Sequence, residues 1–404
     1  LKNEYNVQKI NLKDFYIEKA DIFCLIMEEK IDEANLLNSI LIETEINNDK
    51  YFQKLLNILL NPSNDKIKEV QNLPIEFSEN LIFLYSAMLR IAELPLNEKF
   101  LDIDPNNLAI PIILSNDSEI KLRLKAANKA FLNNLINIES LAALYQSVDF
   151  NSVELNDPIK TIENLSGNGE LTMAFYFQLA NVQIFPSSRL KVIFDYWKFA
   201  ESIGLEKIAY NLTYNIISAL EPSSENAVFG YKIAKSLMYN DDYTKASKWL
   251  LFAETANIED QEIEKVKLLY DLNHSDNIII INQYLDNNYE DLANNANSNF
   301  KEITHVIFSV LENNNIDSSG LIFENVMDER KMPTFFITSK IEESIANNDD
   351  FNLFLLLLVS LDNKEWHELH PEHLKLVLRG IKKYNNSELL KDSLIDILKN
   401  NKIF

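Results

Sequence analysis

The sequence predicts an all-α fold in which irregular helical hairpins stack into a solenoid. Apolar residues recur at three- and four-residue steps through most of the chain, and no period-two pattern persists. A helix–corner–helix unit between Ser224 and Asn257 has a counterpart near the N-terminus. The 404 residues include only six glycines, whereas average proteins contain roughly 7%. That scarcity disfavours folds with many tight turns and Gly-rich phosphate loops.

The clearest hairpin joins a helix ending near Met238 to a helix starting at Tyr243. Its corner, 240–242, contains Asn and Asp, which tolerate left-handed backbone and cap helices. Ala246 is small where the two helices must approach closely. The N-terminal counterpart has the corner Glu28–Glu29, and its residues Leu25, Ile31 and Ala34 stand in the register of Leu237, Tyr243 and Ala246. A recurring hairpin cannot bury its apolar face alone, so we expect the copies to stack.

The same reasoning predicts helices along the rest of the chain, most of them ended by proline, asparagine or glycine. The segment 151–169 is rich in Ser, Asn and Gly and is the best linker candidate. We therefore predict an N-terminal hairpin array at 1–150, a linker at 151–169 and a C-terminal array at 170–404. The predicted helices are three within 12–60, then 78–94, 118–135, 138–145, 170–181, 189–203, 205–220, 258–272, 277–285, 300–311, 333–346, 351–361, and two that begin near 371 and after 386.

The hairpin from Tyr231 to Ala253 resembles a degenerate tetratricopeptide unit, since Ala234 and Ala246 stand near that family's small-residue places. It lacks the regular 34-residue spacing and most of the signature glycine, tyrosine and proline positions. The resemblance implies a right-handed α-α superhelix, a TPR-like solenoid. It does not carry over the peptide-clamping groove of that family.

The chain also resembles uncharacterised helical proteins of alphaproteobacteria that are sometimes labelled antifreeze-glycopeptide-related. The segments that suggest this are Phe23–Cys24 with Glu33–Ala34, the run 122–145, Leu369–Glu372 and 374–379. The resemblance implies no known activity, and the chain lacks the Ala-Ala-Thr repeats that ice binding would need. It implies a periplasmic or exported location rather than a cytoplasmic one. No signal peptide is visible in a chain that begins at Leu1 instead of Met, so an exported origin stays open.

The formal charge is −23, from 61 acidic and 38 basic residues. Nucleic acids and anionic lipids both require clustered positive charge. The basic groups at 121–125 and at Lys382–Lys383 are small and stand among acids, so we predict no nucleic-acid partner. The longest apolar run, Leu353–Leu361, is shorter than the ~20 residues needed to cross a bilayer, so we predict no transmembrane segment.

Residue types that carry chemistry are sparse. Cys24 stands between apolar neighbours, which predicts a buried structural thiol. His367, His370 and His373 have metal-like spacing, but Pro371 should start a helix between them. We therefore interpret them as helix-start residues and expect no metal or cofactor. No common hydrolase, metalloprotease or phosphate-loop motif is present.

The aromatic residues Tyr176, Tyr196, Trp197 and Tyr210 form the candidate binding surface, because tyrosine hydroxyls suit a wet groove. Aromatics at helical spacing more often pack in a core, which is the alternative interpretation. The sequence favours a non-catalytic helical-repeat scaffold that binds a protein or peptide. Two alternatives stay open. One is a helical-toroid enzyme or binding module acting on a peptidoglycan-like glycan, which as an enzyme would need two carboxyl groups in a cleft. The other is a structural envelope protein.

Overall fold

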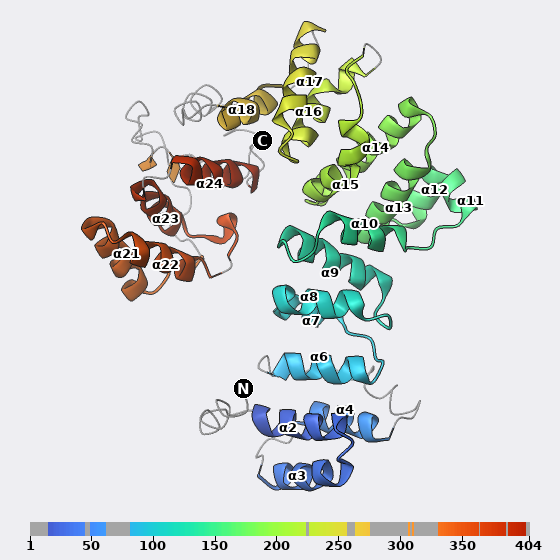
Figure 1. Ribbon diagram of the computed structural model, residues 1–404, viewed down its shortest axis with the longest axis vertical. Helices are drawn as coiled ribbons and strands as arrows, with labels where there is room; N and C mark the ends of the chain where they lie inside the picture. The colour runs from blue at the N-terminus through green and yellow to red at the C-terminus, as the bar shows by residue number, and fades with distance from the viewer. Residues whose placement is uncertain are drawn as a thin grey trace. The chain divides into compact units, whose positions relative to one another are not determined.

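The computed structural model describes residues 15–44, 49–61, 81–223, 226–256, 263–274, 306–307, 309–310, 330–362, 364–384 and 387–400. Every regular element in these ranges is a helix, and none of the described residues lies in a strand (Figure 1). The predicted all-α class is confirmed. The chain divides into two compact units, Leu1–Thr213 and Tyr214–Phe404, called unit 1 and unit 2 below.

Unit 1 is a series of helices in which neighbours in the sequence are also neighbours in space (Figure 1). Its described helices are α2 (Tyr16–Met27), α3 (Ile31–Thr44), α4 (Lys50–Leu60), α6 (Ile82–Ile91), α7 (Glu98–Ile103), α8 (Pro105–Leu114), α9 (Ile120–Leu132), α10 (Ile138–Gln146), α11 (Ser152–Asn156), α12 (Pro158–Asn164), α13 (Gly169–Val182) and α14 (Pro186–Ser202). Contacts run from α2 to α3 and α4, then to α6, α8, α9, α10 and α13. One cluster of buried apolar side chains extends from Ile22 to Ala130, so successive hairpins share a continuous core.

Unit 2 repeats this pairing of consecutive helices. Its described elements are the short 3-10 helix η2 (Ala227–Phe229), α16 (Gly230–Met238), α17 (Tyr243–Thr255), α18 (Ile263–His274), α21 (Phe335–Asn347), α22 (Asp350–Leu361), η4 (Trp366–Glu368), α23 (Pro371–Lys383) and α24 (Ser387–Asn400), while α15 (Glu206–Ser218) spans the division between the units. Helix α16 contacts both α17 and α18, and α21 contacts both α22 and α23. Each first helix therefore contacts its own partner and the helix that follows the pair.

The corner between α2 and α3 is a helix-ending turn with one left-handed residue. Glu29 has φ 61°, and the backbone N–H of Lys30 donates to the carbonyl of Leu25 at 2.9 Å. This is the six-to-one hydrogen bond of a Schellman motif, which satisfies a carbonyl that the helix end would leave free.

The corner between α16 and α17 has the same construction in the predicted register. Asp241 has φ 58°, and Asp242 N–H donates to Leu237 O at 3.0 Å. Leu237 thus corresponds to Leu25, as the sequence comparison predicted. The same bond and left-handed residue recur at four other places in the described chain, with the left-handed residues Glu93, Asn134, Gly204 and Asn348. Only one of these six positions is a glycine, so acids and asparagines fill a place that glycine usually takes.

Residues 151–169, predicted as a linker, contain the two short helices α11 and α12. Asn151 and Glu154 form a reciprocal cap, in which the Asn151 side chain accepts from Glu154 N–H and the Glu154 carboxylate accepts from Asn151 N–H. Pro158 is the first residue of α12. The polar residues that suggested a linker are therefore helix starts. The division between the compact units falls instead within α15.

Cys24 is exposed, so the prediction of a buried thiol is wrong. Helix α2 buries Ile17, Lys19 and Ile22. These buried residues lie in the first two turns of α2, and no residue after Ile22 in the helix is buried, so Cys24 lies beyond the packed part of α2. The predicted helix at 277–285 lies outside the described residues, as does most of the one at 300–311. Among the described helices, none is long and apolar enough to span a membrane.

Candidate functional site

The four aromatic residues predicted as a binding surface lie mostly in the core of unit 1. Tyr196, Trp197 and Tyr210 are buried, and Tyr176 is half-buried with its ring stacked on Tyr196 at a centroid distance of 5.9 Å. The indole N–H of Trp197 donates to the Thr213 hydroxyl at 3.0 Å. Burial raises the pKa of Tyr196 well above its ordinary value. The burial matches the core-packing alternative, and of the four only Tyr176 is partly accessible.

The three histidines of the possible metal cluster do not come together. His373 is buried, with Nε2 at 3.1 Å from the Ser360 hydroxyl, and His370 caps α23 by accepting from the Glu372 N–H at 3.2 Å. His367 lies in η4. Among the described residues, no three His, Cys, Asp or Glu side chains lie close enough together to hold a metal ion. These histidines therefore serve separate helix starts and one helix interface.

A groove of about 470 Å³ lies in unit 1 among α4, α7, the start of α9 and the connection from α6 to α7. This volume is within the range of small-ligand sites, which are about 300–1,000 Å³. Below it is called the α7–α9 groove. Its apolar lining is Tyr51, Leu89, Leu94, Pro95, Leu96, Phe100 and Leu122, and its polar lining is Asn97, Glu98, Glu119, Lys121 and Lys125.

The wall between α6 and α7 is built by one of the recurring turns. Leu94 N–H donates to Leu89 O at 2.9 Å, and Glu93 takes the left-handed conformation with φ 53°. Pro95 follows at once, and proline cannot continue a helix. The chain therefore leaves α6 sharply and presents Leu94, Pro95 and the next residue to the groove.

Two buried serines hold that wall against the α8–α9 connection. The Leu96 N–H donates to the Ser118 hydroxyl at 3.0 Å, and the Ser118 hydroxyl donates to that of Ser115 at 3.0 Å. Both serines are buried. Because these groups satisfy one another away from water, the wall has a fixed backbone position.

The charges at the groove form a ladder between α7 and α9. Lys125 pairs with Glu98 through a hydrogen bond, and Lys129 lies 3.8 Å from Asp102. The acids are four residues apart on α7, and the lysines are four apart on α9, so each set shares one helix face. Lys121 is the next lysine in the series. It is exposed, and it has no hydrogen-bond or ion-pair partner among the described residues.

The ion pair fixes the charge state of the ladder. The hydrogen bond from Lys125 lowers the pKa of Glu98, and the same bond raises the pKa of Lys125. Both groups therefore stay charged over the physiological range. Lys121 adds a positive charge near Glu98, and its ammonium group remains available to an incoming carboxylate.

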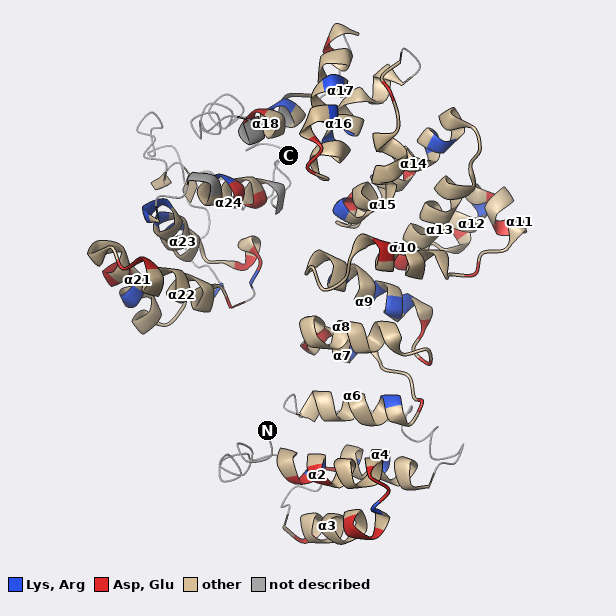
Figure 2. Ribbon diagram, in the orientation of Figure 1, with Lys and Arg blue, Asp and Glu red and all other residues tan. Residues whose placement is uncertain are grey.

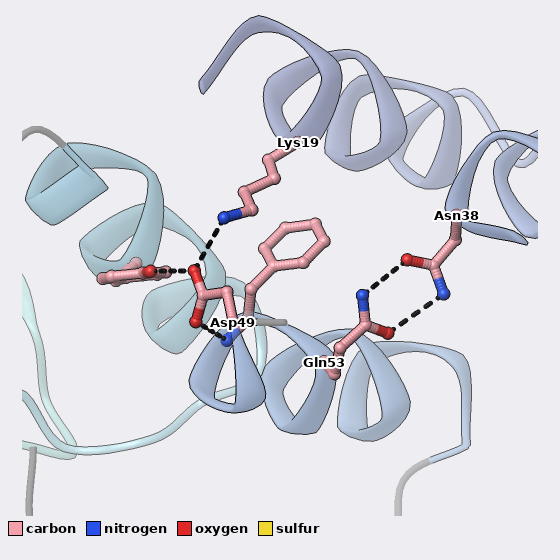
Figure 3. Close-up of polar contacts among 6 residues, drawn as sticks. Lys19, Asn38, Asp49 and Gln53 are labelled. Carbon is pink, nitrogen blue, oxygen red and sulfur yellow. Dashed lines mark hydrogen bonds and ion pairs between the residues drawn. The ribbon is translucent and has the colours of Figure 1, made fainter. Parts of the chain in front are cut away.

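Asp49, two residues before Tyr51, is the centre of a polar network that includes Lys19 (Figure 3). Tyr51 contacts this network through Tyr85. Its ring meets that of Tyr85 edge to face, with centroids 5.0 Å apart. The Tyr85 hydroxyl donates to Asp49, and Lys19 Nζ lies 2.9 Å from the same carboxylate oxygen. Asp49 also caps α4 by accepting from the Phe52 N–H at 3.0 Å. One carboxylate thus ties together α2, α4 and α6.

A second polar contact fixes α4 on its other side. Asn38 and Gln53 exchange two amide hydrogen bonds, of 3.0 and 2.7 Å, between α3 and α4 (Figure 3). The helix that contributes Tyr51 is therefore held by specific polar contacts to three neighbours. Such contacts position a binding wall more sharply than apolar packing alone.

The groove was not predicted from the sequence, although one signal was present. Glu98 and Asp102 are spaced as i and i+4, as are the lysines 121, 125 and 129. That complementary spacing indicates two charged helix faces that can meet, but it does not indicate which helices meet.

No protein-family model, curated protein or solved structure matches this chain. The two family resemblances therefore stay predictions, and only the geometry of the described residues bears on function.

Proposed function

We propose that the chain is a helical-repeat scaffold that binds a peptide segment of a partner protein in the α7–α9 groove. The observation that carries the proposal is a groove with an apolar floor, whose polar edge includes Lys121, a lysine with no ion-pair partner among the residues that the structure describes. Apolar side chains of the partner would occupy the groove, and a carboxylate of the partner would pair with Lys121. Apolar side chains buried in pockets are the usual centres of peptide and protein interfaces.

The charge ladder supports this mode of binding. Glu98 and Lys125 neutralise each other, so they form a polar edge of low net charge. Lys121 is the next position along α9, where α7 offers no acid. A carboxylate from a partner would therefore pair with Lys121 in the way that Glu98 pairs with Lys125. This would fix the register of a bound segment, while apolar burial supplies most of the affinity.

The stacked hairpins supply the second support. Recurring turns of one construction and a continuous buried cluster are the features of helical-repeat proteins, whose usual role is to present extended binding surfaces. We propose that the stack continues as the right-handed, TPR-like superhelix that the sequence favours.

The glycan-enzyme alternative has less support at this groove. A glycosidase needs one carboxylic acid whose pKa is raised so that it can donate a proton. The hydrogen bond from Lys125 lowers the pKa of Glu98 instead. That carboxyl group is therefore suited to binding a cation and poorly suited to acid catalysis.

A peptide-display selection on the full chain would test the proposal. We expect enriched peptides to share a bulky apolar residue with an acidic residue close to it. Leu122→Glu places a charge in the apolar lining and should abolish binding of these peptides. Lys121→Gln should weaken binding about 1.5- to fivefold, the range for one exposed charge pair.

Leu251→Glu is the matched control, because Leu251 is an exposed leucine of α17 that is not part of the groove. It should leave peptide binding unchanged. Circular dichroism of each variant would establish that the fold is retained. The proposal fails if no sequence is enriched, or if the enriched peptides bind the Leu122→Glu variant as well as they bind the original chain.

A further inference from the structure

Unit 2 contains a concentration of positive charge that the overall acidic balance conceals. A groove of about 720 Å³ is lined by four cationic side chains of α23 and by one acid, Asp350. Figure 2 shows Lys and Arg positions of α23 in blue. Below it is called the α23 groove. Its cations are Lys375, Arg379, Lys382 and Lys383, and its other lining residues are Ser309, Val310, Ile345, Asn348 and Tyr384.

The four cations share one face of α23. At 100° per residue, positions 375, 379, 382 and 383 fall within an arc of about 100°. The opposite face is buried and carries Leu374, Val377 and Leu378. In the sequence only Lys382 and Lys383 stand side by side. Apolar residues and a glycine separate the other cations, so the shared face is not evident without the helix.

Three of these cations have no internal role among the described residues. Lys382 Nζ donates to the carbonyl of Val310 at 2.8 Å, which joins α23 to the opposite wall. Lys375, Arg379 and Lys383 make no hydrogen bond or ion pair with any described residue, and Arg379 and Lys383 are exposed. Lysines in the last turn of a helix often complement the helix dipole, which accounts for Lys382 and Lys383. It does not account for Lys375 and Arg379, which lie further back along the helix.

From these observations we infer that the α23 groove binds an acidic peptide segment in extended conformation. The cations run from Lys375 to Lys383, over eight residues or about 12 Å of helix. Side chains on one side of an extended peptide are about 6.6 Å apart, so three acids at alternate positions span about 13 Å. An acidic segment of the form Glu-x-Glu-x-Glu therefore matches the spacing of the cations. Asn348 and Tyr384 offer further polar groups to its backbone and side chains.

The shape of the cationic face favours a peptide over a compact phosphate group. A single phosphate is bound by donors that converge on one point, often backbone N–H groups at a helix start. The cations here are spread along the middle and the C-terminal half of α23. The C-terminal end of a helix has a partial negative charge, which disfavours a compact anion there. An extended ligand with several separate carboxylates suits this distribution better.

The experiment is a titration of the full chain into a fluorescein-labelled peptide with a Glu-Ser-Glu-Ser-Glu core, followed by fluorescence anisotropy at low and at high salt. We expect saturable binding that weakens as salt rises, since exposed charges are screened. The triple variant Lys375→Gln, Arg379→Gln, Lys383→Gln should bind about three- to 150-fold more weakly, because it loses three exposed charge pairs. The peptide with Gln in place of Glu should not bind.

The matched control is Lys198→Gln, Lys207→Gln, Lys248→Gln, which removes three exposed charges from other helices. It should retain the original affinity, and circular dichroism would show that both triple variants are folded. Equal weakening by both triple variants would mean that only net charge matters, and would overturn the inference. Absence of binding to the original chain would also overturn it. The inference would also be overturned if tripolyphosphate bound more tightly than the peptide and the α23 triple variant lost this binding. The site would then be one for a compact polyphosphate. None of these results depends on the α7–α9 groove, so this inference and the proposed function fail separately.

Discussion

The hairpins α2–α3 and α16–α17 share one turn but are held in place by different chemistry. Their corners have the same left-handed position and the same six-to-one hydrogen bond. The first hairpin is fixed by a buried charge pair, in which Lys19 is 1% exposed and reaches Asp49 at the start of α4. The second is fixed by close contact, because a Cβ added at Gly230 would lie 2.8 Å from the Cβ of Ala253.

The difference shows that the turn is a local property and the helix interface is not. Helix α3 leaves Leu36, Ile40 and Ile42 exposed, whereas α17 buries Trp249 and Leu250. Both helices follow the same turn in the same register. What each hairpin buries, and whether polar or apolar contacts secure it, therefore depends on the neighbouring helices.

The largest expected effect is at the charged interface. Asp49→Ala should lower the free energy of unfolding by about 3–5 kcal/mol, since it leaves the buried Lys19 ammonium without this carboxylate and removes the cap of α4. Urea unfolding followed by circular dichroism would measure it. The double variant Lys19→Met, Asp49→Ala should be more stable than the single variant, because it no longer buries a charge. Equal stability of the two variants would show that the charge pair does not hold this interface.

The interface between α22 and α23 in unit 2 contains a buried histidine, His373, that makes only one of its two possible hydrogen bonds with the residues that the structure describes. Burial lowers the pKa of His373 from 6.5 to about 4, and its Nδ1 has no hydrogen-bond partner among the described atoms. The unfolded chain therefore binds more protons than the folded chain between pH 6.5 and 4. Stability should fall by about 2–3 kcal/mol as the pH drops through this window.

The measurement is urea unfolding at a series of pH values for the original chain and for His373→Gln. The variant should lose less stability between pH 6.5 and 4 than the original chain does. His367→Gln is the control, since His367 is exposed, and it should keep the original pH dependence. Identical pH profiles for all three chains would contradict the assignment.

The sterically fixed interface should respond to a single methyl group. Gly230→Ala should destabilise the chain by about 1–3 kcal/mol, because the added Cβ meets Ala253 and neither backbone can retreat easily. Thermal unfolding would detect the loss, and adding Ala253→Gly should restore part of it. Gly380→Ala is the matched comparison. Its Cβ would meet the flexible ends of Leu357 at 3.1 and 3.2 Å, so it should cost less, and the reverse order would contradict this account.

The smallest expected effect tests whether the two turns are equivalent. Glu29→Gly should stabilise the chain by about 0.5–1 kcal/mol, because glycine adopts positive φ without the strain of a side chain. Asp241→Gly should gain less. Burial and the neighbouring Asp241 raise the pKa of Tyr243 to about 12, and a hydrogen bond between the two residues would be lost. If thermal unfolding showed a larger stabilisation by Asp241→Gly than by Glu29→Gly, the hydrogen bond between Asp241 and Tyr243 would not contribute to stability.

Much of the fold could be predicted from local patterns. Helical periodicity predicted the helices of the first hairpin, of α16–α17 and of the pairs near the C-terminus, and the register of Leu25 with Leu237 is confirmed by hydrogen bonds. The same local reasoning wrongly predicted that Cys24 is buried. It identified polar residues at 151–169 correctly as helix breakers but missed that they also start helices.

The two grooves could not be predicted in this way, for a physical reason. Each is lined by residues from helices far apart in the sequence, such as Tyr51 with Lys125 in one and Asn348 with Arg379 in the other. The sequence shows the spacing of the charged residues on α9 and α23. Which of these charges form ion pairs depends on the helices that pack beside them.

The sequence by itself determined that this chain is helical, where its hairpins turn, and that a left-handed residue occupies their corners. These are properties of a few consecutive residues, whose backbone preferences and capping groups act at short range. Only the tertiary structure decided that Lys19 is buried, that Cys24 is exposed, and that Lys121 and Arg379 line grooves where no described residue pairs with them. Burial and pairing depend on contacts between distant segments, and packing selects among the many arrangements that one helical pattern allows.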